Sequence, residues 1–285
     1  MASIAPVALI TGGASGIGLA VAERLMDLDW RVAIADIQAA DDGRYASQLT
    51  DGRILLLRVD VSSYDEQADA FSQVYKTWGR IDFVFANAGI LERADFCAPA
   101  TETANGAPPR PDTTVIDVDF HGVVWSSYLA LHYFRKNASK GGSLVMTSST
   151  AGIYAISEVP LYAAAKHGVL GLARSLGKRM KESGEPITVN AIIPGAVPTA
   201  IVPQSVIDAI PARFLTPASL IVKAIENILD DPSINGQAIE CSGDEIVNRP
   251  PHPFVNEACE YTAGGGYRDK AGQDAVLKFG MDGKQ

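Results

Sequence analysis

Cysteine is scarce in this sequence of 285 residues, which contains only Cys97, Cys241 and Cys259. The three are widely spaced, form no CxxC pair and are odd in number. They therefore predict reduced thiols in a cytoplasmic protein rather than a disulfide framework. Histidine is also rare, with four residues. His121 and His132 share a face of one predicted helix, but no cysteine or carboxylate accompanies them at ligand spacing, so we expect no metal site.

Positive charge and long apolar runs are lacking too. Lys and Arg number 24 against 33 Asp and Glu, for a formal net charge of −9. This balance, without basic runs, argues against nucleic acid and against an anionic membrane surface as partners. No apolar stretch approaches about 20 residues, the length that spans a bilayer. The N-terminal segment has no basic start, so we expect no secretory signal.

The sequence does contain a regular alternation of short apolar runs and amphipathic segments. The runs predict strands, and the segments predict helices. Continuous apolar strands separated by helices are typical of a parallel sheet covered on both faces. We therefore expect one doubly wound α/β domain over residues 1–248, with about seven strands. The predicted strands are 7–10, 31–36, 54–59, 81–86, 143–148, 187–193 and 237–240, and the predicted helices are 17–28, 64–78, 114–137, 160–183 and 217–229.

Two segments interrupt this alternation. Residues 92–114 contain four prolines and five alanines without clear periodicity, and residues 249–285 form a C-terminal tail that carries three consecutive glycines. Each segment can be a plain surface loop or tail, or it can shape a binding site. For the tail we expect packing on a neighbouring subunit or near the substrate mouth.

A glycine-rich turn, Thr11-Gly-Gly-Ala-Ser-Gly-Ile-Gly18, joins the first predicted strand to the first predicted helix. Gly12, Gly16 and Gly18 permit a tight turn, a close approach of the backbone to a pyrophosphate, and close packing of the helix on the strand. The helix start around Ser15 and Ile17 offers free N–H groups and the positive end of the helix dipole. The turn therefore predicts dinucleotide binding rather than a merely structural role.

Asp36 ends the second predicted strand, 18 residues beyond Gly18. A carboxylate at this place can accept hydrogen bonds from the ribose hydroxyls of an adenosine and would repel a 2′-phosphate. No Arg or Lys stands at position 37 or 38, or within the glycine turn, to neutralise such a phosphate. The sequence therefore favours NAD over NADP as the cofactor.

A candidate acid/base centre lies farther along the chain. Tyr162 and Lys166 are four residues apart on a predicted helix and so share one face. A lysine ammonium one turn away favours the phenolate form of a tyrosine, which makes the tyrosine a better base. Ser149 follows the fifth predicted strand, at the carboxyl end of the sheet where ligands bind in such folds. Its hydroxyl can contact a substrate oxygen there.

Together these residues resemble those of the short-chain dehydrogenase/reductase family, over nearly the whole chain up to about residue 248. Within the family, the chain is most similar to the branch that includes NAD-dependent 15-hydroxyprostaglandin dehydrogenase and fungal dehydrogenases of secondary metabolism. The matching segments are Thr11–Gly18, Asp60-Val61, Asn87-Ala-Gly89, Ser149, Tyr162-Ala-Ala-Ala-Lys166, Asn190 and Pro194-Gly-Ala-Val-Pro-Thr199.

The resemblance implies a Rossmann fold and a role for each matching residue. Tyr162 is the implied general acid/base, Lys166 assists it and holds the nicotinamide ribose, and Ser149 orients the substrate oxygen. The resemblance also implies that the protein forms a homodimer or homotetramer. Further cofactor contacts are implied for Asp60, Val61, Asn87, Ala88, Gly89, Pro194, Val197 and Thr199.

One position departs from the family pattern. Many members carry an Asn on the long helix, in a pattern like Val-Asn-Leu-x-Gly, and here the corresponding stretch is Val118-Asp-Phe-His-Gly122. Asp119 therefore stands as a candidate catalytic residue in place of the Asn. An ionised aspartate accepts hydrogen bonds but donates none, and its charge would partly oppose the effect of Lys166 on Tyr162. The change is either a tolerated isosteric swap or a sign of altered activity.

The leading functional hypothesis is an NAD-dependent oxidoreductase that interconverts a secondary alcohol and a ketone on a mid-sized apolar metabolite. The substrate class follows from the resemblance and from the variable segments 92–114 and 201–215, the second of which is rich in apolar residues and suits a substrate lid. The alternatives are a dehydratase or isomerase on the same scaffold, and a catalytically weak nucleotide-binding regulator.

Overall fold

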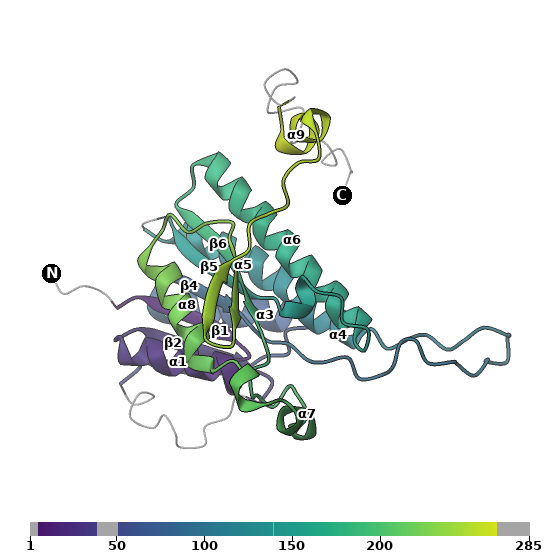
Figure 1. Ribbon diagram of the computed structural model, residues 1–285. Coiled ribbons are helices and arrows are strands. Elements are labelled where there is room, and N and C mark those ends of the chain that lie inside the picture. The colour runs from purple at the N-terminus through teal and green to yellow at the C-terminus, as the bar shows by residue number, and fades with distance from the viewer. Residues whose placement is uncertain (1–4, 39–50, 139, 267–285) are drawn as a thin grey trace. The chain divides into compact units, whose positions relative to one another are not determined.

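The computed structural model describes residues 5–38, 51–138 and 140–266, and the chain divides into two compact units, Met1–Arg249 and Pro250–Gln285 (Figure 1). The first unit holds every predicted strand and every predicted helix. The second unit contains the short helix α9, Glu257–Gly264, whose start is capped by the side chain of Asn256 accepting from the backbone N–H of Cys259. The position that we expect for the tail stays a prediction.

The first unit is built on one eight-stranded sheet in the order β3-β2-β1-β4-β5-β6-β7-β8. The first seven strands in this order run parallel, and the direction of winding reverses between β1 and β4. The doubly wound sheet is thereby confirmed. The strands are β1 Val7–Thr11, β2 Arg31–Asp36, β3 Ile54–Arg58, β4 Phe83–Ala86, β5 Gly142–Thr147, β6 Ile187–Pro194, β7 Ala238–Ser242 and β8 Glu245–Asn248.

The structure adds an eighth strand to the seven that the sequence predicts. β8 pairs antiparallel with β7, and Ser242 lies opposite Glu245 across the turn that joins them. The turn contains Gly243, whose φ of 59° falls in the region that glycine adopts without strain. β8 has only four residues, none of them buried, so it lacks the continuous apolar run that marks the buried strands.

Helices cover both faces of the sheet (Figure 1). α1 (Gly16–Asp27) and α8 (Ala218–Asp230) pack on one face, where Leu25 and Ile228 join a cluster of buried apolar side chains. α3 (Tyr64–Trp78), α5 (Gly122–Lys136) and α6 (Pro160–Ser183) pack on the other, through residues such as Phe71, Phe134 and Val169. The two faces need two apolar layers, which explains why the central strands are apolar on both sides.

The long helix predicted at 114–137 is not uniform. It begins as α4 (Thr114–Ile116), widens into a π-helical turn over Asp117–His121, and continues as α5. A π-turn inserts one residue into the helical repeat, which a periodicity of 3.6 does not reveal. The turn contains Asp119, and such turns recur at functional sites.

Three short elements lie near the carboxyl ends of the strands and were not predicted. A 3₁₀ turn, Thr150–Gly152, follows β5. Helix α7 (Gln204–Ala209) and a second 3₁₀ turn, Ala212–Phe214, follow β6 and lie within the apolar segment 201–215. Across the described residues, no helix combines the length and apolar character needed to cross a membrane.

Candidate active site

The glycine turn between β1 and α1 borders a cavity of about 1020 Å³. Gly12 and Gly16 have φ values of 65° and 54°, so both need the conformational freedom of glycine. A Cβ atom at Gly18 would overlap the carbonyl oxygen of Gly12. The residues therefore fit a dinucleotide pyrophosphate, because the turn brings bare backbone and the start of α1 to the edge of the cavity.

The cavity brings together most of the site residues that the sequence predicts. It is lined by Gly12, Ser15, Gly16, Ile17, Asp36, Asp60, Val61, Asn87, Ala88, Gly89, Ser149, Tyr162, Lys166, Pro194, Val197 and Thr199. Gly18 and Asp119 do not line it. Gly18 lies beneath the turn, where it allows α1 to pack on Gly12, and Asp119 is fully buried.

Asp36 is fixed at the end of β2 by two backbone groups. Its Oδ2 accepts a hydrogen bond from Ala14 N at 3.1 Å, and its Oδ1 accepts one from Gln38 N at 2.9 Å. The first bond ties the carboxylate to the glycine turn itself. Each carboxylate oxygen retains a lone pair that can accept from a ribose hydroxyl.

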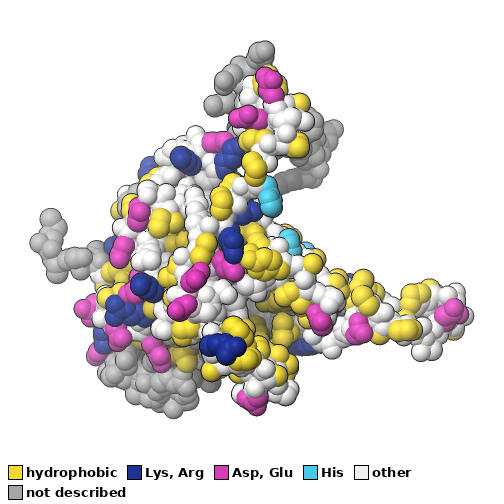
Figure 2. Space-filling model, viewed as in Figure 1, with side chains coloured by type: hydrophobic (Ala, Val, Ile, Leu, Met, Phe, Trp, Pro, Cys, Tyr) yellow, Lys and Arg dark blue, Asp and Glu magenta, His cyan; other side chains and the backbone are white. Residues whose placement is uncertain are grey.

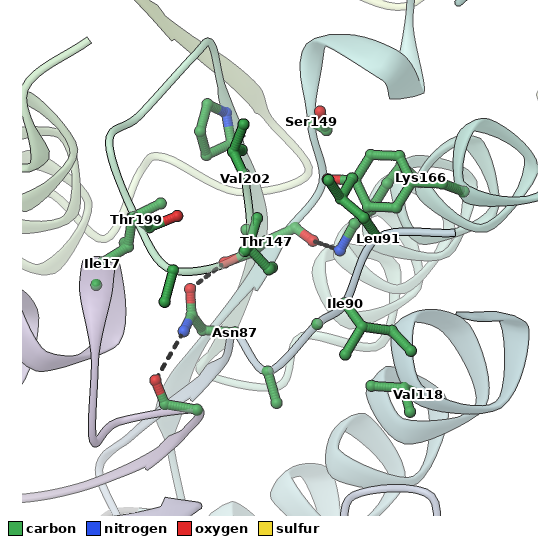
Figure 3. A pocket seen from close by; sticks show the side chains of 18 of the residues that line it. Ile17, Asn87, Ile90, Leu91, Val118, Thr147, Ser149, Lys166, Thr199 and Val202 are labelled. Carbon is green, nitrogen blue, oxygen red and sulfur yellow. Dashed lines mark hydrogen bonds between the residues drawn. The ribbon is translucent and has the colours of Figure 1, made fainter. Parts of the chain in front are cut away.

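A hydrogen-bond network joins the carboxyl ends of three neighbouring strands. Thr11 Oγ1, on β1, accepts from the backbone N–H groups of Asn87 and Ala88 at 3.0 and 3.2 Å. Asn87 Nδ2 donates to the carbonyl oxygen of Gly12 at 3.2 Å. Asn87 Oδ1 accepts from Thr147 Oγ1, on β5, at 3.0 Å (Figure 3). The network holds the loop after β4 in a fixed place beside the glycine turn.

Lys166 enters the cavity from α6 and is 2% exposed. Its Nζ donates to the carbonyl oxygen of Thr147 at 3.1 Å (Figure 3). The same Nζ lies 5.4 Å from the centroid of the Tyr162 ring. Ser149 lines the cavity after β5, and its Oγ accepts from Ala151 N at 3.2 Å. Tyr162, Lys166 and Ser149 therefore converge on one cavity, as an acid/base centre requires.

Asp119 forms a buried ion pair with Lys166. Its Oδ2 is 2.9 Å from Lys166 Nζ, and its Oδ1 accepts from Ile90 N at 2.8 Å. Burial raises the pKa of Asp119, against the opposing effect of the Lys166 charge. Burial alone would lower the pKa of Lys166, but the adjacent Asp119 carboxylate raises it above its ordinary value. The pair therefore keeps the lysine charged.

Gly89 makes room for this ion pair. A Cβ atom at Gly89 would lie 2.9 Å from Asp119 Oδ2 and 3.4 Å from Lys166 Nζ. A side chain at this position would therefore push the two charged groups aside.

Comparison with known proteins agrees with this geometry. A sequence model described as short chain dehydrogenase matches residues 6–208. The chain belongs to the short-chain dehydrogenase family. This confirms the resemblance that the motifs indicate, and it makes the protein an oxidoreductase of a family that binds a nucleotide cofactor.

Two relatives of this short-chain dehydrogenase represent the two branches of the family that its sequence resembles. The short-chain dehydrogenase/reductase prx7 of Penicillium rubens is 36% identical over 264 residues, covering 84% of this chain and 92% of prx7. The NAD(+) 15-hydroxyprostaglandin dehydrogenase of Homo sapiens is 29% identical over 253 residues, covering 85% of this chain and 88% of the human one. Among solved structures, levodione reductase has a TM-score of 0.68 at 27% identity and covers 84% of this chain and 96% of its own.

Sequence reasoning did not identify every residue of the site. Thr147 and Glu92 line the cavity and form hydrogen bonds within the site, but neither lies in a motif. Asn190 was matched as part of a motif, and it lies buried on β6 and bonds the carbonyl oxygen of Ile234 at 2.8 Å, away from the cavity. Apolar side chains line much of the rest of the cavity, among them Ile90, Leu91, Val118, Ile156, Val159, Ile201 and Val202.

Proposed function

We propose that this short-chain dehydrogenase interconverts a secondary alcohol and a ketone with NAD as the cofactor. The observation that carries the proposal is the convergence of Tyr162, Lys166 and Ser149 on the cavity that the glycine turn borders. NAD supplies the acceptor of the hydride in oxidation, and NADH supplies the donor in reduction.

In the proposed reaction the chain's own residues handle the proton. When the alcohol is oxidised, the Tyr162 oxygen takes the hydroxyl proton of the substrate; when the ketone is reduced, the Tyr162 hydroxyl returns it. The Ser149 hydroxyl donates a hydrogen bond to the substrate oxygen and so stabilises negative charge that develops there. Lys166, held by Thr147 and Asp119, places a positive charge beside the Tyr162 ring and favours the phenolate.

The preference for NAD rests on Asp36. Asp36 is 8% exposed, and its carboxylate accepts from Ala14 N in the glycine turn and from Gln38 N just after β2. A 2′-phosphate beside it would bring two negative groups together, and positions 37 and 38, which are Ile and Gln, supply no cation to neutralise it. The name of the human relative, which specifies NAD(+), supports the same choice.

The substrate that we propose is a mid-sized apolar molecule. Ile156, Val159, Ile201 and Val202 line the cavity, and apolar pocket walls favour apolar ligands. The adjoining segment 201–215 exposes Val206 and Phe214, and Figure 2 shows hydrophobic side chains over this part of the surface. An apolar substrate would cover such side chains, so we propose that this segment closes over it. The homo-oligomer stays a prediction.

Tyr162→Phe tests the proposal. The variant keeps the ring but loses the hydroxyl, so turnover should fall below detection while NADH binding, measured by fluorescence titration, stays within about twofold of the wild type. Turnover is followed as NADH formation from cyclohexanol, 1-phenylethanol, 2-octanol and 2-decanol. A variant that retains turnover would refute the acid/base role, and a wild type inactive on all four alcohols and their ketones would count against the substrate class.

A further inference from the structure

Helix α6, which carries Tyr162 and Lys166, begins without a cap of its own. Its N-cap residue is Val159, which offers no side-chain acceptor, and its first turn contains no acidic residue. Pro160 has no N–H, and Ala163 N donates to the carbonyl oxygen of Val159 at 2.9 Å. The N–H groups of Leu161 and Tyr162 therefore need an acceptor from outside the helix.

Glu92 supplies that acceptor from the loop after β4. Its Oε2 accepts from Leu161 N at 2.9 Å and from Tyr162 N at 3.1 Å. One carboxylate oxygen thus satisfies both free donors of the first turn, although it lies about 70 residues away along the chain. Its negative charge also sits at the positive end of the dipole of a 24-residue helix, where carboxylates are stabilising.

We propose that Glu92 is a positioning residue for Tyr162. Lys166 lies one turn deeper in α6 and is fixed by Thr147 and Asp119. Tyr162 lies in the first turn, where helices fray, and its own backbone N–H is one of the two groups that Glu92 holds. By fixing this turn, Glu92 sets where the Tyr162 hydroxyl stands relative to Lys166 and to the substrate oxygen.

The second oxygen of Glu92 forms no hydrogen bond with the described residues that would draw the carboxylate away from α6. Oε1 is buried and has no hydrogen-bond partner among the described residues. Leaving a buried carboxylate oxygen unpaired costs free energy, so the two bonds formed by Oε2 must offset that cost. Glu92 also lines the cavity and is the first residue of the segment 92–114, so the same contact ties this loop to the helix that bears the acid/base centre.

The test compares Glu92→Ala with Glu92→Gln and with Glu158→Ala. Alanine removes both hydrogen bonds, whereas glutamine keeps an oxygen that can accept them. Glu158 is an exposed carboxylate just before α6 that does not cap it, so its removal serves as a matched control. Loss of one helix cap removes only a small part of the stability of a domain, so we expect each variant to fold.

We expect Glu92→Ala to lower kcat by about tenfold to a hundredfold, because small displacements of a reacting group have effects of this size. KM and NADH affinity should change by less than about threefold, since both hydrogen bonds that are removed go to the backbone of α6. Glu92→Gln should recover most of the lost kcat, and Glu158→Ala should match the wild type. Amide hydrogen exchange of a peptide spanning 160–166 should be faster in Glu92→Ala alone.

The inference rests on the proposed role of Tyr162, and the two can fail separately. If Tyr162→Phe retains turnover, the proposed function fails, whereas the exchange experiment still reports whether Glu92 holds the first turn. If Tyr162→Phe is inactive and Glu92→Ala keeps the wild-type kcat, the positioning role is refuted. An equal loss in Glu92→Gln and Glu92→Ala, or a parallel loss of NADH affinity, also contradicts it.

Discussion

Replacing Asp119 by Asn removes one charge from the buried ion pair and leaves the shape of the side chain nearly unchanged. Asp119 Oδ2 is 2.9 Å from Lys166 Nζ, and that Nζ is 5.4 Å from the Tyr162 ring centroid. The carboxylate is therefore at most about 8 Å from the ring, where two unit charges interact by about 2 kcal/mol at an effective dielectric constant of about 20.

The negative charge of Asp119 repels a phenolate at Tyr162. Removing that charge should therefore favour the phenolate form. About 2 kcal/mol corresponds to about 1.5 pH units, which sets the size of the change that we expect in the pH profile. In Asp119→Asn, the acidic inflection of the kcat/KM–pH profile should move to lower pH by that amount. At alkaline pH the variant should lose activity earlier, because burial lowers the pKa of Lys166 and the carboxylate no longer opposes it.

The measurement is NADH formation from the most reactive alcohol of the panel between about pH 5 and pH 10, a range that covers both limbs. Asp117→Asn is the matched control, because Asp117 lies in the same π-helical turn but is about half exposed and pairs with His121. Its charge is screened by water, and its profile should match the wild type. An acidic inflection that stays in place, or moves to higher pH, in Asp119→Asn would refute the reasoning.

Two further predictions concern the cofactor. Replacing Asp36 by Ala together with Ile37→Arg removes the repelling carboxylate and adds a cation, so the ratio of the Kd values for NADH and NADPH should shift by at least about tenfold toward NADPH; an unchanged ratio in fluorescence titrations would contradict the assignment. Gly18→Ala places a Cβ atom against the Gly12 carbonyl oxygen and 2.8 Å from Asn87 Nδ2, so NADH affinity should fall by at least about tenfold, and wild-type affinity would show that α1 can move without cost.

Sequence reasoning placed those elements best whose ends are determined locally. The bounds of α3 and α6 match the predicted ones, Tyr64–Trp78 and Pro160–Ser183, and α6 has local signals in the proline of its first turn and in Gly184, with a φ of 68°, after its last residue. In α3 the cap is the adjacent Ser63, whose side chain accepts from Glu66 N, and the helix ends at Gly79 with a φ of 73°. Signals of this kind lie within a few residues of the helix end, so they are visible in the sequence.

The elements that escaped prediction depend on tertiary structure. The antiparallel strand β8 is half exposed and owes its conformation to pairing with β7. The π-helical turn contains the buried residue Asp119, whose ion-pair partner, Lys166, comes from another helix. Neither feature alters the local pattern of apolar residues enough to be recognised.

The same distinction applies to the site. The glycine turn and the Tyr162–Lys166 pair are short-range patterns, so their chemistry can be recognised from the sequence alone. Glu92 has no such pattern, because its two partners are the backbone N–H groups of Leu161 and Tyr162, about 70 residues away. The available signal was indirect: α6 begins with Val159-Pro160 and has no acidic residue in its first turn, so its donors had to be satisfied from elsewhere.

Asp119 shows how the structure changes the meaning of a substitution that is visible in the sequence. Asn and Asp have nearly the same shape, so by packing alone the change is neutral. In the fold the side chain is fully buried beside a buried ammonium, with Gly89 packed closely against the pair. At such a place the charge cannot be screened by solvent, and its interaction with Lys166 outweighs any similarity of shape. We therefore expect the residue to act through the protonation equilibrium of the proposed acid/base centre rather than through packing.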